Sequence, residues 1–145
     1  MLLFFYTINQ MIKKSFLKNL LLVSIFLMLV QIYIGTGVRE FIDDQSKLFG
    51  REDKSLWLSN ATFKFYFHRS FSIIILLINA LIYYISFQLK INLIYIKLIF
   101  SFIMIEILFG AIMYYFDFPI LTQPAHLIIA IGIFCIQFYW LLKLR

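Results

Sequence analysis

The chain contains two histidines, His68 and His126, and each stands at the start of a long apolar stretch. A neutral imidazole is a common metal ligand, and it can also gain or lose a proton near neutral pH. Arg69 follows the first histidine directly, and Pro124 lies two residues before the second. What the two imidazoles can do together depends on the segments that position them.

Those segments are unusually apolar. Hydrophobic residues make up 63% of the 145-residue chain and charged residues only 14%, against roughly 45–50% and about 25% in an ordinary soluble domain. A soluble fold of this length has too little interior to bury so much apolar surface. The composition therefore predicts an integral membrane protein. The single cysteine, Cys135, cannot form an intrachain disulfide, and we interpret it as a small, buried apolar side chain within a span.

The hydropathy pattern predicts one all-α domain over residues 1–145, a four-helix membrane bundle. Each expected span is long enough to cross a bilayer, and turns with lysine or proline separate the later ones. The expected spans are residues 20–38, 68–89, 93–115 and 125–142. The only long hydrophilic stretch, about 39–67, is expected to be a surface loop with a helical piece.

The positions of the charged residues predict the orientation of the bundle. The amino terminus, the turn after the second span and the carboxyl terminus carry bases and no acids; these bases are Lys13, Lys14, Lys18, Lys90, Lys97, Lys143 and Arg145. On the other side, bases and acids balance. Positive residues stay in the cytoplasm, so both termini are expected there and the long loop outside. Because the bases follow the span ends, the net charge of +6 does not indicate nucleic-acid binding.

This topology places both histidines near the outer face, at similar depth on two parallel helices. Two imidazoles that face each other can ligate one haem iron from opposite sides, and such sites are built in the cores of helix bundles. Arg69 and Arg39 lie on the same side and could pair with the haem propionates. The ring would be expected to lie among apolar side chains of the second and fourth spans, namely Phe71, Ile74, Ile75, Ile129 and Ile133. The alternatives are that the histidines are solvated or hydrogen-bonded end residues, or that they hold zinc, which usually needs more protein ligands.

Polar residues inside the spans are the remaining exceptions. Glu106 lies in the middle of the third span, where an ionisable group is expensive and suggests a function. One interpretation is a protonated carboxyl group that hydrogen-bonds to Asn79 or a similar group and so joins two helices, and another is a role in proton handling. Gln31, Asn79 and Gln137 are expected to join helices by hydrogen bonds, and Gly35 is expected to permit close packing.

Four segments in this order and spacing resemble the carboxyl-terminal half of haem A synthase, the membrane enzyme that oxidises a methyl group of haem O to a formyl group. The resemblance covers the chain from about Leu20 onward. It rests on the segments that begin at Gln31 (QIYIGTGVRE), His68 (HRSFS), Glu106 (EILFG) and Gln123 (QPAHL). It implies that the chain holds a low-spin haem b, with His68 and His126 at the ligand positions.

The resemblance has one informative departure. In that family the substrate-binding half carries a glutamate three residues before its first histidine, and here Phe65 occupies the equivalent position. The outer loop also lacks the cysteine pair found in the substrate half of many members. The chain thus resembles the cofactor half without its catalytic partner, so a second half or a homo-oligomer is an expected partner beside haem and lipid. The expected activity is haem A formation in the plasma (inner) membrane. The alternatives are a non-catalytic electron-transfer or oxidase-assembly subunit, and a structural four-span protein without a cofactor.

Overall fold

The structure, a computed structural model, describes residues 2–50, 52–59 and 61–144, and only the backbone of residues 2–9. Within these ranges there are four α-helices, one short 3-10 helix and no strand; they are α1 (Leu2–Phe49), η1 (Lys54–Leu58), α2 (Phe63–Gln88), α3 (Ile94–Tyr115) and α4 (Thr122–Lys143). Each α-helix is long and apolar enough to cross a membrane. The predicted all-α fold with four membrane helices is therefore confirmed.

The hydrophilic stretch after the first span is largely helical. The predicted loop began at residue 39, whereas α1 continues to Phe49. Ion pairs one turn apart accompany this extension: Arg39 Nε lies 3.7 Å from Asp43 Oδ2, and Lys47 Nζ lies 2.9 Å from Asp44 Oδ1. The helix stops where Gly50 adopts a positive φ of 77°, a conformation that glycine supplies at helix ends. Arg51, Asn60 and Arg145, which the sequence-based predictions included, lie outside the described residues.

Both histidine-bearing helices also begin earlier than predicted. α2 starts at Phe63 rather than at His68, and α4 starts at Thr122 rather than near residue 125. Pro124 does not prevent this, because the first amide groups of a helix have no intrahelical acceptor and proline is tolerated there. The two histidines consequently lie in the second turn of their helices and not at the first residue.

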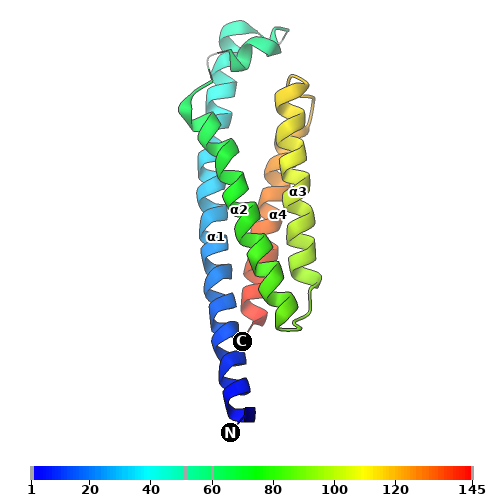
Figure 1. Cartoon of the computed structure of the whole chain (residues 1–145). Coiled ribbons are helices and arrows are strands. Elements are labelled where there is room, and N and C mark those ends of the chain that lie inside the picture. Colours follow the sequence, from blue (N-terminus) through cyan, green and yellow to red (C-terminus); the bar gives the residue numbers. More distant parts are fainter. Residues whose placement is uncertain (1, 51, 60, 145) are drawn as a thin grey trace.

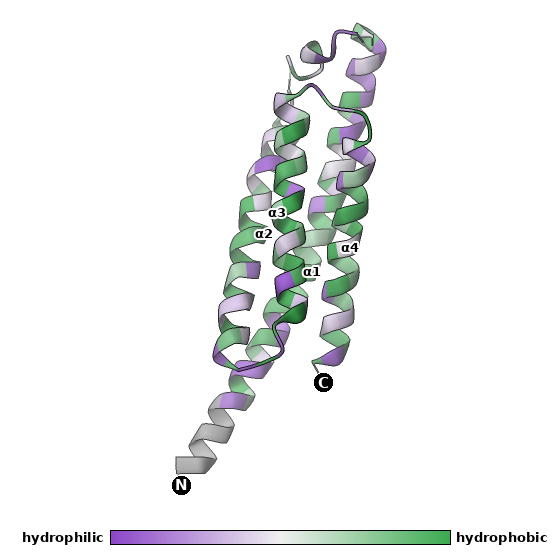
Figure 2. Cartoon of the chain, turned by 90° about the vertical axis from the view of Figure 1, so that its right-hand side faces the viewer, coloured by the Kyte–Doolittle hydropathy of each residue, from purple (hydrophilic) through white to green (hydrophobic). Residues whose placement is uncertain are grey.

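The four helices form a bundle in which α1 packs most extensively on α2, and α3 on α4 (Figure 1). Fewer contacts join α1 to α4 and α2 to α3. Each helix thus has two neighbours, and α2 lies diagonally across from α4. The α1–α2 connection and the α3–α4 turn share one end, which we call the loop end. Apolar residues dominate the middle of all four helices, whereas hydrophilic residues gather at their ends (Figure 2).

The half of the bundle away from the loop end has a closed core. Its buried apolar side chains come from all four helices and include Leu21, Ile82, Ile99 and Trp140. Cys135 of α4 was expected to be buried as well, but it is exposed on the outside of the bundle. A buried polar cluster, comprising Ser24, Asn79 and Gln137, joins three helices within this core. Asn79 Nδ2 and Gln137 Nε2 each donate to Ser24 Oγ at 2.9 Å, and Gln137 Nε2 lies 3.2 Å from Asn79 Oδ1. The predicted interhelical role of Asn79 and Gln137 is confirmed. Their hydrogen bonds hold the two helix pairs together in the half of the bundle away from the loop end.

Candidate functional site

A cavity of about 420 Å³ opens between the helix pairs in the half of the bundle nearer the loop end. All four helices contribute to its walls. It contains every residue that the sequence suggested as a site: His68, His126, Arg39 and Arg69. A volume of this size is typical of small-molecule and cofactor sites, which are mostly apolar with a few polar groups. The chemistry that the cavity can support depends on how the helices position these polar side chains.

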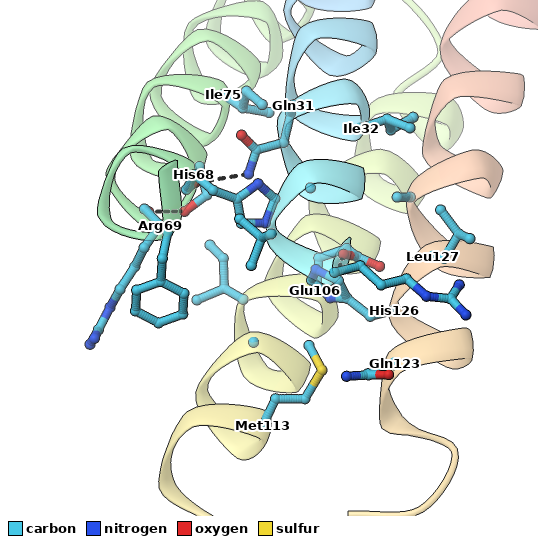
Figure 3. A pocket seen from close by; sticks show the side chains of 18 of the residues that line it. Gln31, Ile32, His68, Arg69, Ile75, Glu106, Met113, Gln123, His126 and Leu127 are labelled. Atoms are coloured by element: carbon cyan, nitrogen blue, oxygen red, sulfur yellow. Dashed lines mark hydrogen bonds and ion pairs between the residues drawn. The ribbon is translucent and has the colours of Figure 1, made fainter. Parts of the chain in front are cut away.

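The two imidazoles project into this cavity from opposite corners of the bundle (Figure 3). His68 comes from α2 and His126 from α4, and their ring centres are 6.4 Å apart with 72° between the ring planes. Two imidazoles on opposite sides of one iron, each with a nitrogen about 2 Å from the metal, have ring centres roughly 6 Å apart. The observed separation therefore suits a shared metal centre, and the sequence alone could not give it.

Two glycines on the other diagonal leave room beside the imidazoles. A Cβ atom at Gly35 of α1 would lie 3.0 Å from Cε1 of His68, closer than ordinary carbon contacts allow. A Cβ atom at Gly110 of α3 would lie 4.0 Å from Cε1 of His126. Close packing at Gly35 was expected from the sequence, and its partner is now identified as the first histidine. The His68 ring thus packs directly against the backbone of Gly35, whereas a side chain at Gly110 would reach only ordinary contact distance from the His126 ring.

Glu106 of α3 lies against the second histidine. Its Oε2 atom is 2.7 Å from Nδ1 of His126, and the carboxylate side chain is only 13% exposed. The contact is close but not aligned with a ring N–H, so no well-formed hydrogen bond to Nδ1 is present among the described residues. The predicted bond between Glu106 and Asn79 is wrong, because the Asn79 amide turns to Ser24 of α1 instead. The rotation of α3 about its axis aims Glu106 at α4.

Several buried polar atoms around the cavity lack a hydrogen-bond partner in the described part of the chain. They are Gln31 Oε1, His68 Nδ1, Glu106 Oε1 and His126 Nδ1. Gln31 is fixed by its other atom, since its Nε2 donates to the backbone oxygen of His68 at 3.0 Å. Buried polar groups are normally satisfied, and a cluster of exceptions requires an explanation such as a missing ligand. Of the five such atoms in the described residues, these four line one cavity, whereas the fifth, Gln137 Oε1, lies in the closed core. The four atoms together favour a binding site in this cavity.

The two arginines lie at the rim of the cavity. The Arg69 guanidinium carbon lies 4.7 Å from the centre of the Tyr114 ring, a cation–π contact that holds this side chain at the α2–α3 edge. Arg39 comes from α1 and pairs loosely with Asp43, with its side chain 58% exposed. An exposed pair of this kind contributes little to stability, so Arg39 can turn to an anion without a large loss. Tyr114 was not identified from the sequence, because nothing there fixes the rotation of α3.

The apolar walls differ in part from the expectation. Ile75 and Ile133 line the cavity, but Phe71, Ile74 and Ile129 do not. Ile74 is 46% exposed on the outside of α2, since neighbouring residues on a helix point about 100° apart and cannot share one face. The remaining apolar lining of the cavity comes from α1 and α3, through residues such as Ile32, Ile103 and Ile107.

The donor set fits a haem better than a bare metal ion. In the described residues, no three His, Cys, Asp or Glu side chains come together in a way that could hold a metal ion. A haem brings four nitrogens of its own and needs only two axial ligands from the protein. The two imidazoles from opposite helices and the two arginines that line the cavity meet those needs. His68 and His126 would be the axial ligands, with Arg39 and Arg69 near the propionates.

No protein-family model, curated protein or solved structure matches the chain.

Proposed function

We propose that this chain is a membrane haem protein that binds one haem b through His68 and His126 and takes part in haem A biosynthesis. In this proposal it acts as the haem b-binding half of a haem A synthase-type enzyme, whose reaction oxidises the haem O methyl group to a formyl group. The observation that carries the proposal is the pair of imidazoles 6.4 Å apart across the bundle diagonal. The choice of pathway rests on the resemblance of the four sequence segments.

When bound, the haem would supply one-electron redox chemistry at its iron. The protein's own part is ligation, exclusion of water and neutralisation of charge. His68 and His126 would bind the iron, and the isoleucines of the cavity wall would keep its surroundings apolar. Arg39 and Arg69 provide positive charge at the rim, where a carboxylate accepts charge-assisted hydrogen bonds from guanidinium groups. We further propose that the loop end faces away from the cytoplasm in the plasma (inner) membrane.

A second candidate is a haem-binding electron-transfer or oxidase-assembly subunit that carries out no oxidation itself. The side chain three residues before His68 favours it. Phe65 lines the cavity, and its ring stacks on Tyr114 with centroids 6.0 Å apart. An aromatic ring at this position cannot accept a proton as a carboxylate would. This candidate retains the haem site and removes only the oxidation of haem O.

Expression in cells that make haem O but no haem A tests the proposal and separates the candidates. We expect the purified chain to hold haem b, identified after extraction and counted as one per chain. Haem A should then form when the chain is produced with a partner half that carries a Glu-x-x-His-Arg segment. Haem b binding without haem A formation in the presence of that partner would favour the electron-transfer subunit. A chain purified from haem-replete membranes without haem would exclude both.

A further inference from the structure

Glu106 is the most unusual residue of the cavity, since it places a carboxylate inside an apolar wall at mid-helix. We propose that Glu106 is a positioning residue for His126: its carboxylate accepts a hydrogen bond from Nδ1–H and so presents Nε2 of His126 to the haem iron. This inference rests on the proposed haem site and assigns a role that the site itself does not require. The contact of 2.7 Å between Oε2 and Nδ1 carries it.

The chemistry of imidazole explains why such a contact matters. A neutral imidazole carries its proton on one nitrogen and its lone pair on the other, and the partner of the first nitrogen decides which is which. With an acceptor at Nδ1, the proton stays there and Nε2 becomes the ligand. Metal-bound histidines usually donate their second N–H to a carboxylate, a carbonyl group or water, which fixes the ring and raises its basicity. At 2.7 Å, Oε2 already lies within hydrogen-bond distance of this nitrogen.

The other histidine has no such support. Nδ1 of His68 is buried without a hydrogen-bond partner among the described residues. Gln31 contacts the His68 backbone rather than its ring, and Gly35 limits the ring only by steric contact. The two ligands would therefore donate unequally, with His126 the stronger. A stronger donor and a nearby negative charge both favour ferric over ferrous iron, so Glu106 should lower the reduction potential.

A purely structural role for Glu106 makes a different prediction. A residue that only ties α3 to α4 can be replaced by glutamine, which has the same shape and still offers a carbonyl oxygen. Charge and acceptor strength, in contrast, are lost in Glu106→Gln. The fitting control is Glu40→Gln, the same chemical change at an exposed residue of α1 that does not line the haem cavity.

The experiment compares the reduction potential and haem-dissociation rate of purified wild-type protein, Glu106→Gln and Glu40→Gln. We expect Glu106→Gln to remain low-spin, to have a higher potential and to bind haem about 10-fold or more weakly, the usual effect of losing a partner of a ligating histidine. Glu40→Gln should match the wild type. Unchanged potential and haem affinity in Glu106→Gln would overturn the inference while leaving the haem site intact.

A second variant, Glu106→Asp, tests the same role of the carboxylate. If Glu106→Gln does not fold, Glu106→Asp retains the charge but shortens the reach by one methylene group, and it should raise the potential in the same direction. An unchanged potential in that variant would also overturn the inference. Wild-type protein that holds no haem would overturn the proposed function together with this role of Glu106. Variants His68→Ala and His126→Ala that both keep the wild-type spectrum would have the same consequence.

Discussion

His68 and His126 approach each other across the diagonal of the bundle, with imidazole centres 6.4 Å apart. The helices that carry them, α2 and α4, are not adjacent, and α1 and α3 fill the other corners. On the side of the imidazoles away from the loop end, the polar cluster of Ser24, Asn79 and Gln137 holds the helices together. The space between the imidazoles is therefore a property of the whole fold and not of one helix pair.

The glycine beside the first histidine gives a direct test of the space around the ligand. Gly35→Ala places a Cβ atom 3.0 Å from Cε1 of His68 and should displace the ring. We expect weaker haem binding and an altered low-spin signal. The higher helix propensity of alanine favours α1 by roughly 0.5–1 kcal/mol, whereas displacement of the His68 ring opposes this gain in stability. Haem titration and thermal unfolding of the haem-free protein measure the two effects separately.

Gly37→Ala is the matched control for that substitution. Its Cβ atom would meet Lys64 Cδ at 3.7 Å, an ordinary contact away from the histidines. Haem binding should therefore equal that of the wild type. Equal losses in both variants would mean that changes in helix α1, rather than contact with His68, explain the effect.

The contact between Arg69 and Tyr114 predicts how the rim recognises an anion. Arg69→Gln should weaken haem binding by roughly 10- to 100-fold, because a hydrogen bond to a charged group is worth about 1.5–3 kcal/mol. Tyr114→Phe keeps the ring under the guanidinium and should bind like the wild type, whereas Tyr114→Leu should lose part of the affinity. A Tyr114→Leu variant that binds haem normally would show that the stacking does not position Arg69.

The orientation in the membrane can be tested by labelling single cysteines in intact cells. In a Cys135→Ser background, Ser59→Cys lies in the exposed segment between α1 and α2, and Ser15→Cys lies on an exposed part of α1 at the opposite end. Because bases are concentrated on the side of the termini, a membrane-impermeant thiol reagent should label Ser59→Cys from outside and not Ser15→Cys. The reverse pattern would place the loop end in the cytoplasm.

Much of the fold could be predicted because membrane helices leave a strong one-dimensional signal. Long apolar segments and their turns gave four helices, and α3 at Ile94–Tyr115 agrees with its prediction within one residue. The end of α1 could not be predicted as well, since Asp43, Asp44 and Lys47 resemble a loop by composition. Their ion pairs lie one turn apart, as they do in a helix, and each adds only a small stabilisation because it is exposed.

The candidate site was only partly accessible from sequence. Topology could place His68 and His126 at similar depth, but not choose between adjacent and diagonal helices. The rotation of each helix about its axis was also open, which is why Glu106 was matched to Asn79 rather than to His126. Glu106 and Gly110 are four residues apart and so share a face of α3. That spacing was the available signal that both residues line one space.

The central claim is that His68 and His126 ligate one haem, and optical spectra of the purified protein test it most directly. Wild-type protein should show the sharp reduced spectrum of a low-spin, six-coordinate haem. His68→Ala and His126→Ala should each lose that spectrum, since removal of either imidazole leaves the iron with one axial protein ligand. If both variants keep the wild-type spectrum, or if the wild-type protein shows no haem absorption, the claim is contradicted.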